Sequence, residues 1–237
     1  MSARQSRAPR WYVSVRSPYS WLALRDAEAY GSGILADSEM HVFFEPTGEF
    51  AGKVTEKSAV FHYTPMSRSK HLYILRDVAR LVRQRELTIT WPLDDNPAWE
   101  VSAVALARVL SESQSEGKRL AFALANARWL EGRNVHEEST VENCLTELGL
   151  DGGLAALHRT EEGLEIGRTL LKQLDRDGVF GVPYFIVGRE AYWGLERLFL
   201  AEEAHASSAS LVPAVAAPLM TVEEAAGPLD DQPGGCG

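Results

Sequence analysis

Short strand-like segments occur at the start of the chain and again near residue 185, with helices between them, and this arrangement constrains the fold most. Residues 11–16 and 40–45 are aromatic and β-branched, and a helical stretch over 18–30 separates them, which is typical of a βαβ unit. Strand patterns return at 184–187 and 191–193 around a Gly-Arg turn and predict a β-hairpin. The chain therefore predicts an α/β fold that is interrupted by a helical insertion.

Helical periodicity dominates from about residue 66 to residue 176. Apolar residues recur there at spacings of three and four, as in Val101, Val104 and Ala105. The one strand-like interruption is the segment LTITW at 87–91. We expect about five helices in this interval.

These patterns divide the chain into an α/β domain and an inserted all-helical domain. The α/β domain is discontinuous and comprises residues 11–52 and 177–206, while the insertion comprises residues 53–176. Residues 207–237 are rich in Ala, Ser, Pro and Gly and are expected to be a disordered tail. The chain has a formal net charge of −9, but residues 201–237 hold six acidic and no basic residues, so the first 200 residues carry only −3.

Composition and charge exclude several classes of function. The chain lacks a basic stripe with interleaved aromatic residues, so we expect no nucleic-acid partner. Apolar windows are broken well before 18 residues, and no apolar stretch with a cleavage site follows the N-terminus, so we expect a cytoplasmic protein without a membrane partner. Cys144 and Cys236 lie far apart without ligand-spaced histidines, which indicates neither a disulfide framework nor a metal site. A small molecule is the partner that we expect.

The segment VSVRSPYSWLAL, residues 13–24, joins the first strand to the first helix through Ser17 and Pro18. Serine is a favoured N-cap and proline is favoured at the first helical position, so a purely structural role explains both residues. The first turn of a helix also leaves backbone N–H groups without partners and carries the positive end of the helix dipole. Ser17 is therefore either an ordinary cap or part of a site for an anion.

A second motif, GVFGVPYFIVG, places Gly-Val-Pro directly before a strand at residues 181–183. Thioredoxin-like proteins place a cis-proline at this point of their fold. A cis X-Pro bond would turn the backbone of Val182 outward, where it could pair with an extended peptide. A small peptide thiol is such a ligand.

Taken together, SPYSWLA, FGVPYFIVG and the later YWGLERL resemble the 2-hydroxychromene-2-carboxylate isomerase family over about residues 11–200. That family is a sister to kappa-class glutathione transferases and to helix-inserted, DsbA-like disulfide oxidoreductases. The resemblance implies a thioredoxin-like fold with an inserted all-helical domain, and it implies a homodimer because relatives form them.

In the oxidoreductase branch the first helix begins with Cys-x-x-Cys, whereas this chain has Ser17 and Ser20 at those positions. Thiol–disulfide exchange needs a thiolate, so serine cannot perform it. The resemblance implies instead that Ser17 hydrogen-bonds the thiolate of bound glutathione or another small thiol. Lowering a thiol pKa from about 8.5 by two units takes about 2.7 kcal/mol. A charged hydrogen bond of about 1.5–3 kcal/mol and a helix end of about 0.3–1 kcal/mol are sufficient.

For the cofactor, the resemblance implies a backbone clamp at Val182 and Pro183. It implies that Trp193, Leu195 and Glu196 receive the γ-glutamyl end of glutathione. The family usually has a small polar residue and Asp where this chain has Leu195 and Glu196, so a different small thiol is an open alternative.

For the substrate, the resemblance implies a conjugated, aromatic carboxylate or ketone that is isomerised by reversible thiolate addition. Lys53 lies about where isomerases place a lysine against the substrate carboxylate, with a surface lysine as the alternative. Arg16 stands where the family has an apolar residue, and it binds an acidic group of the substrate or pairs with a carboxylate at the strand end. Tyr19 is a third candidate for substrate contact. A kappa-type glutathione transferase and a non-catalytic thiol-binding protein are the alternative functions.

Overall fold

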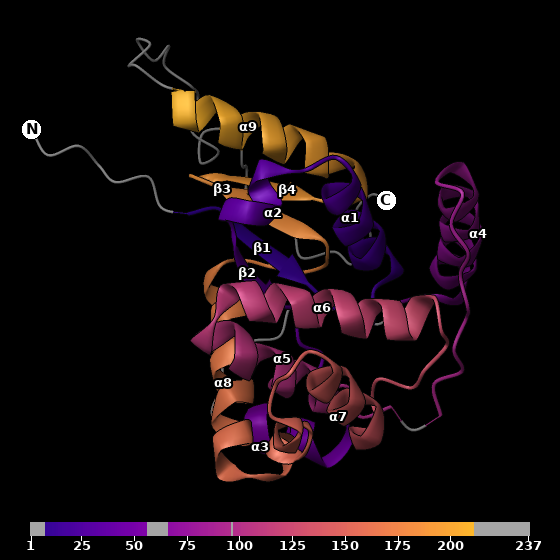
Figure 1. The fold of residues 1–237 in the computed structure, drawn as a ribbon, viewed down its shortest axis with the longest axis vertical. Helices are drawn as coiled ribbons and strands as arrows, with labels where there is room; N and C mark the ends of the chain where they lie inside the picture. The colour runs from indigo at the N-terminus through magenta and orange to yellow at the C-terminus, as the bar shows by residue number, and fades with distance from the viewer. Residues whose placement is uncertain (1–7, 56–65, 96, 211–237) are drawn as a thin grey trace, which may run out of the picture.

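The computed structural model describes residues 8–55, 66–95 and 97–210, drawn in colour in Figure 1. The described residues form a four-stranded sheet of order β2-β1-β3-β4. The strands are β1 (Arg10–Val13), β2 (Glu39–Val42), β3 (Tyr184–Val187) and β4 (Glu190–Trp193). The β1–β2 pair is parallel, and the β1–β3 and β3–β4 pairs are antiparallel. The predicted βαβ unit and hairpin are thereby confirmed, and β1 joins them into one sheet.

Three helices pack around this sheet. Helices α1 (Pro18–Ala29) and α2 (Gly33–Asp37) connect β1 to β2, and η2 (Leu195–Arg197) leads from β4 into α9 (Leu198–Ser210). Figure 1 shows α1, α2 and α9 at the sheet end of the molecule. Helix α9 runs past the expected end of the domain at residue 206, and the rest of the predicted tail, 211–237, lies outside the described residues.

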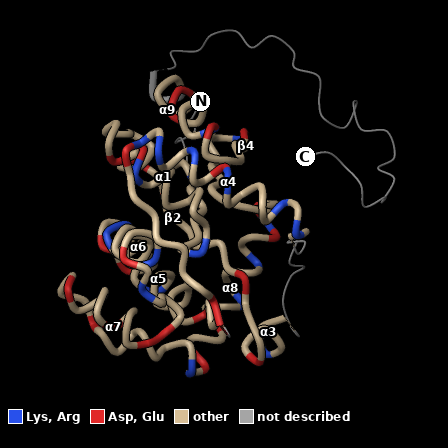
Figure 2. Tube along the Cα trace, turned by 90° about the vertical axis from the view of Figure 1, so that its right-hand side faces the viewer, with Lys and Arg blue, Asp and Glu red and all other residues tan. Residues whose placement is uncertain are grey.

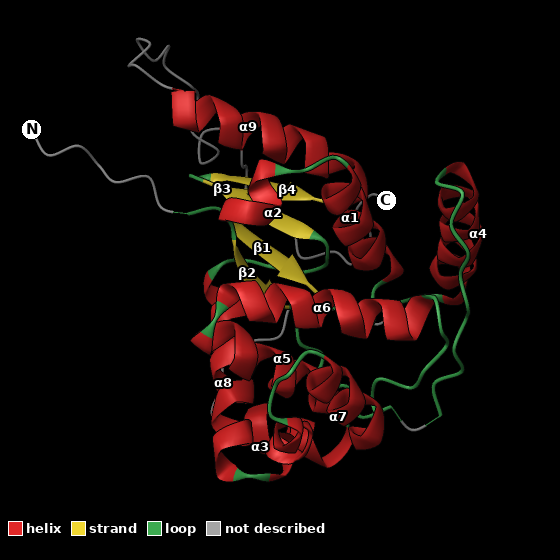
Figure 3. Cartoon of the chain, in the orientation of Figure 1, coloured by secondary structure: helices red, strands yellow, loops and turns green. Residues whose placement is uncertain are grey.

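The interval between the two parts of the sheet is helical, as predicted. Figure 3 shows these helices in red below and beside the sheet. They are α3 (Gly48–Thr55), α4 (Arg68–Gln84), α5 (Glu100–Glu112), α6 (Gln114–Trp129), α7 (Glu138–Glu147), the 3-10 helix η1 (Gly152–Arg159) and α8 (Glu161–Arg176). Helix α3 spans the expected domain boundary at residue 53 and packs on α8. The α/β fold with a helical insertion is confirmed.

The segment LTITW at 87–91 forms a loop and not a strand, contrary to its β-branched composition. Its backbone finds partners at the end of a helix: Thr90 N–H donates to Trp129 O at 2.8 Å. The Thr90 hydroxyl donates to Leu130 O at 3.0 Å. The long loop between α4 and α5 is therefore held to the C-terminal end of α6, which places Trp91 and its neighbours beside the sheet.

Helix α6 also holds the junction between β1 and α1. The indole N–H of Trp129 donates to Val15 O at 3.0 Å, and that of Trp21 donates to Asn126 Oδ1 at 3.0 Å. Both bonds join residues more than a hundred positions apart in the chain. Because buried polar groups need partners, these two bonds fix the turn before α1 against the helical domain.

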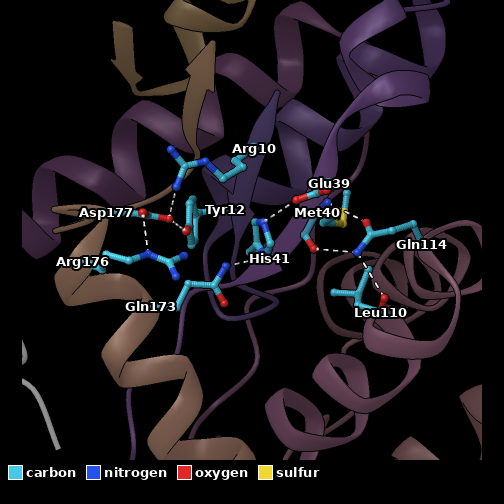
Figure 4. A network of polar contacts seen from close by, with 10 residues as sticks. All are labelled: Arg10, Tyr12, Glu39, Met40, His41, Leu110, Gln114, Gln173, Arg176 and Asp177. Carbon is cyan, nitrogen blue, oxygen red and sulfur yellow. Dashed lines mark hydrogen bonds and ion pairs between the residues drawn. The ribbon is translucent and has the colours of Figure 1, made fainter. Parts of the chain in front are cut away.

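Two groups of polar side chains lie beside β1 and β2, as Figure 4 shows, one around Gln114 and the other around Asp177. The Gln114 amide accepts from Met40 N–H at 2.7 Å and donates to Met40 O at 3.3 Å, so it occupies part of the open edge of β2. In the second group, Tyr12 donates a hydrogen bond to Asp177, which also forms ion pairs with Arg10 and Arg176.

Charge is spread over the described chain. Figure 2 shows basic and acidic positions interspersed along the trace. Within the described ranges, no helix combines the length and apolar content needed to cross a membrane.

Candidate active site

Ser17 is the N-cap of α1, with extended backbone angles of φ −88° and ψ 118°. Its Oγ accepts a hydrogen bond from Ser20 N–H at 3.2 Å, and Pro18 is the first helical residue. Ser20 is buried, and its own Oγ accepts from Ser14 N–H at 3.3 Å. The first turn of α1 has no acidic residue, so the positive end of the helix is not neutralised locally.

A cleft of about 410 Å³ opens in front of this helix end. It lies between the β1–α1 turn, the first turns of α4, the 91–94 loop, the end of α6 and the segment before β3. Seven of its 21 lining residues carry aromatic rings. They are Tyr19, Phe43, Tyr73, Trp91, Trp129, Phe180 and Trp193. The cleft therefore combines a positive helix end with flat apolar surfaces that fit an aromatic molecule.

The Val182–Pro183 peptide bond is cis, the isomer that the Gly-Val-Pro motif predicts. Val182 lines the cleft with Ser17, while Pro183 is buried behind it and accepts from Gly194 N–H at 3.0 Å. Gly181 is required here, because a Cβ at this position would lie 2.8 Å from Trp193 Nε1. The Phe180 and Trp193 rings stack edge to face at 4.8 Å and form the rim.

The two residues after Trp193 lie beside the cleft and do not line it. Leu195 is 3 % exposed and belongs to the hydrophobic core. Glu196 is exposed in the first turn of η2, and its charge acts on Tyr19 across the surface. Leu195 offers no polar group to a ligand, whereas the Glu196 carboxylate remains in reach of an ammonium group bound at the rim.

Lys53 is not brought to this cleft. It lies on α3, where its Nζ pairs with Glu49 Oε1 at 2.9 Å, and it lines a separate cavity in the helical domain. The cause is the path of the chain after β2, since α3 turns away from the sheet to pack on α8. Ser17 and Lys53 therefore cannot act on one small ligand in this structure.

Tyr19 lines the cleft and donates its hydroxyl proton to Asp77 Oδ2 on α4, at 2.7 Å. Burial raises the pKa of Tyr19, and the hydrogen bond to Asp77 and the charge of that carboxylate raise it further. The tyrosine is therefore a neutral phenol, and its ring is what it offers to a substrate. The pair also joins the first helix to α4.

Arg16 lies at the mouth of the cleft, paired with Glu45 and placed over the Trp99 ring at 5.3 Å. Arg128 lies over the same ring at 4.7 Å and forms a bidentate pair with Asp94 at 2.9 and 2.8 Å. Cations over an indole ring are attracted by its electron-rich face. Both arginines thus line the cleft, and each guanidinium group already pairs with a carboxylate.

Sequence reasoning missed the face that α4 presents to the cleft. Lys70, His71, Tyr73 and Ile74 all line it. Lys70 is exposed, and no carboxylate of the described residues lies within ion-pair distance of its side chain. Lys70, Tyr73, Ile74 and Asp77 have the helical i, i+3, i+4 and i+7 spacing, which could have revealed a common face. The i, i+3 spacing of Asp77 and Arg80 predicts the intrahelical ion pair that they form, but it does not predict the hydrogen bond from Tyr19 to Asp77.

Neither a metal site nor a reactive thiol is formed by the described residues. They contain no group of three or more His, Cys, Asp or Glu side chains suited to a metal ion. Cys144 is buried in α7, and burial raises the pKa of its thiol. Among the described residues, Cys144 does not line the cleft.

Comparisons with known proteins agree with this geometry. The family model of the DSBA-like thioredoxin domain matches residues 10–206. A 2-hydroxychromene-2-carboxylate isomerase from Sphingobium xenophagum is 25% identical over 146 residues, which cover 60% of this chain and 73% of the relative.

Two solved structures share the fold. A 2-hydroxychromene-2-carboxylate isomerase has a TM-score of 0.62 at 21% identity, over 85% of this chain and 95% of the other. The cytosolic disulfide reductase DsbM from Pseudomonas aeruginosa has a TM-score of 0.56 at 13% identity, over 85% of this chain and 97% of the other. Similarity at these identities concerns the fold alone.

Proposed function

The chain belongs to the DSBA-like thioredoxin domain family, and we propose that it is an isomerase that uses glutathione or another small thiol. Its substrate is a conjugated, aromatic carboxylate or ketone. The observation that carries this proposal is the position of Ser17, which lies at the N-terminal end of α1 and lines an aromatic cleft together with Val182. No cysteine of the described residues lines this cleft, and in this proposal the thiol comes from the cofactor.

Ser17 is suited to hold a thiolate because its hydroxyl group has two separate roles. The oxygen accepts from Ser20 N–H, and the hydroxyl proton remains for a second acceptor. A thiolate in front of α1 would receive this proton as a hydrogen bond and would also face the positive end of the helix dipole. Both interactions favour the anion over the thiol and therefore lower its pKa.

The remainder of a peptide thiol has partners along one wall of the cleft. The backbone of Val182 can pair with an extended peptide, and Trp193 offers a ring at the rim. Glu196 can pair with an ammonium group, and Lys70 with a carboxylate. Val182, Trp193 and Glu196 come from the second part of the α/β domain and Lys70 comes from α4, so the ligand lies across the junction between the domains.

The reaction needs no external oxidant or reductant. The thiolate adds to the β-carbon of the conjugated double bond, and the electron pair of that bond moves to the carbonyl oxygen. Rotation then occurs about the resulting single bond. Return of the electron pair expels the thiolate and gives the rearranged substrate. Arg16 can stabilise a substrate carboxylate at the mouth while it shares its charge with Glu45.

One observation favours a non-catalytic thiol-binding protein as a second candidate. Leu195 is buried where the related enzymes have a small polar residue, so the γ-glutamyl end of glutathione has one hydrogen bond fewer. A kappa-type transferase uses the same cleft and differs in its product, a stable thioether. Recovery of free thiol with rearranged 2-hydroxychromene-2-carboxylate would separate the isomerase from both alternatives.

The test uses three substitutions at Ser17 that separate capping from thiolate binding. Ser17→Thr keeps the cap and the hydroxyl proton, Ser17→Asp keeps the cap but places a negative charge against the thiolate, and Ser17→Ala loses both. We expect Ser17→Asp to unfold at the temperature of the parent chain but to lose at least a hundredfold in thiol-dependent turnover. Ser17→Thr should retain most turnover. Parental turnover in Ser17→Asp would reduce Ser17 to a cap and refute the mechanism.

A binding measurement tests the cofactor separately. A ligand that binds only the folded state, at 100 times its dissociation constant, adds about 2.7 kcal/mol to the free energy of unfolding. Glutathione should therefore raise the melting temperature of the parent chain, and Ser17→Asp should reduce this shift.

A further inference from the structure

The helical domain contains a second cavity, of about 670 Å³, which shares no lining residue with the cleft. It lies between α3, the start of α5, the end of η1 and α8. Its lining residues are Thr47, Gly48, Glu49, Phe50, Lys53, Pro97, Ala98, Glu100, His158, Arg159 and Leu164. The proposed isomerase reaction uses none of them.

Three oxygen atoms converge at the wall of this cavity. Thr47 Oγ1 lies 2.8 Å from Pro97 O and 2.8 Å from Glu100 Oε2. A threonine hydroxyl has one proton, so it can satisfy one of these two acceptors fully at any moment. The hydrogen bonds recorded for the Thr47 hydroxyl therefore divide one donor between two acceptors.

Glu100, which provides one of these two acceptors, is 8 % exposed. No lysine, arginine or histidine within the described part of the chain pairs with its carboxylate. Glu100 begins α5, so the positive end of that helix offsets part of its charge. The helix end does not provide a donor to the Pro97 carbonyl, however.

We propose that this cavity is a binding site for an organic primary ammonium group. Such a group carries one positive charge and three N–H donors, which match the carboxylate, the hydroxyl and the carbonyl oxygen. Phe50 and Leu164 provide apolar surface for the body of the ligand. A divalent metal fits less well, because Ca²⁺ and Mg²⁺ take six or more oxygen ligands and this set offers one buried carboxylate.

The ammonium group can belong to a simple amine or to an amino acid. Lys53 and Arg159 stand at the rim, but Lys53 pairs with Glu49 and Arg159 with Glu138 at 2.5 Å. An amino acid would have to share these cations through its carboxylate. Both ligands would bind through the same three oxygen atoms.

The experiment is calorimetric titration of the full chain with three probes of matched length: n-pentylamine, norleucine and 1-pentanol. Norleucine is pentylamine with an added α-carboxylate, and 1-pentanol lacks the charge. We expect at least one of the two ammonium compounds to bind and 1-pentanol not to bind. Tighter binding of norleucine assigns the site to amino acids, and tighter binding of pentylamine assigns it to simple amines. Binding by neither, or equal binding of 1-pentanol, overturns the proposal.

Variants connect the binding to the three oxygen atoms. Glu100→Gln keeps the shape of the side chain and supplies an N–H donor, so it should leave the melting temperature unchanged or higher while amine affinity falls at least tenfold. Thr47→Val should weaken binding at least threefold and serves as a second test if Glu100→Gln does not fold. Glu112→Gln, exposed at the far end of α5 and outside the cavity lining, should bind as the parent does. Parental affinity in Glu100→Gln or in Thr47→Val would refute the site.

The cleft provides the last control. Ser17→Asp changes a cavity that shares no residue with this one, so it should leave amine affinity unchanged. Amine binding therefore stands or fails independently of the isomerase reaction. A loss of amine binding in Ser17→Asp would place the amine in the cleft and overturn the assignment.

Discussion

Two tyrosine–aspartate hydrogen bonds join segments that are distant in the sequence, and they sit in different surroundings. Tyr12 on β1 donates to Asp177, which follows α8 and also pairs with Arg10 and Arg176 (Figure 4). Tyr19 on α1 donates to Asp77 on α4, at 2.7 Å. The first pair is packed against the sheet, and the second forms part of the cleft wall.

The difference lies in how the partner cations are solvated. Arg10 has a side chain that is 13% exposed, so it cannot exchange Asp177 for water without moving. Arg80, which pairs with Asp77, is 55% exposed and already largely hydrated. Buried ion pairs are costly to break from one side, whereas exposed pairs contribute little. The Tyr12 pair therefore stabilises the return of the chain from α8 to the sheet, and the Tyr19 pair mainly shapes the cleft.

The largest effect that separates the two pairs is expected from truncating each aspartate. Asp177→Ala leaves the buried guanidinium of Arg10 without its carboxylate and should lower the free energy of unfolding by about 3 kcal/mol. Asp77→Ala should cost about 1.5 kcal/mol, because Arg80 turns to water and one hydrogen bond from the Tyr19 hydroxyl to a carboxylate is lost. Urea unfolding of both variants measures the difference. Equal losses would mean that the two pairs play the same role.

A pH titration sharpens the same comparison. Burial raises the pKa of Asp177, but hydrogen bonds from Tyr12, Arg10 and Arg176 outweigh it and hold that pKa at about 2, below the usual 3.8. A depressed carboxyl pKa stabilises the folded state above the unfolded pKa, and this stabilisation is lost as the pH falls through the folded pKa. Between about pH 4 and pH 2 the chain should lose about 2 kcal/mol from this group.

The control for that titration is Asp177→Ala, which should lack this part of the acid sensitivity. Unfolding free energies are measured at several pH values between 2 and 5 for both chains. If the parent and Asp177→Ala lose stability in parallel over this range, Asp177 is not the group responsible.

Features that depend on neighbouring residues could be predicted from this sequence, whereas contacts between distant segments, such as the two tyrosine–aspartate pairs, could not. The strands, the helical insertion and the cap at Ser17 follow from local patterns, because β-branched runs, helical spacing and Ser-Pro are each confined to a few neighbouring residues. The segment LTITW at 87–91 has a strand-like pattern but forms a loop, because its hydrogen-bond partners, Trp129 and Leu130, lie at a helix end about 40 residues away. Tertiary contacts of this kind override strand propensity.

The composition of the cleft was predicted in part. The motif around Ser17 follows β1, and the motif around Pro183 directly precedes β3. Because β1 and β3 are paired, the fold itself brings Ser17, Val182 and Trp193 together. Lys53 and Lys70 both follow β2, and nothing local distinguishes the lysine that reaches the cleft. Helix α3 carries Lys53 away and α4 brings Lys70 in, which depends on how each helix packs.

Removing one hydroxyl group from the sheet side gives the next smaller effect. Tyr12→Phe keeps the ring in the core and deletes the donor to Asp177, which keeps its two arginine partners. We expect the free energy of unfolding to fall by about 1–1.5 kcal/mol. Thiol-dependent turnover should stay at the parental value below the melting temperature. A change in turnover would show that this network reaches the cleft.

The smallest effect on stability is expected from Tyr19→Phe. The ring still fills the cleft wall, and Asp77 keeps Arg80 as a partner, so the free energy of unfolding should fall by less than about 1 kcal/mol. Without its hydroxyl group the residue no longer ties α1 to α4, and Lys70 and Tyr73 on α4 are held less firmly at the cleft. We therefore expect kcat/KM to fall about threefold to tenfold, mainly through KM, since Lys70 is proposed to bind the ligand and does not react. Tyr73→Phe is the matched control, because it removes a hydroxyl from the same face without touching the bond to Asp77. If Tyr19→Phe lowers kcat and leaves KM unchanged, the Tyr19 hydroxyl takes part in the chemistry and the proton that it shares with Asp77 has a role beyond holding α4.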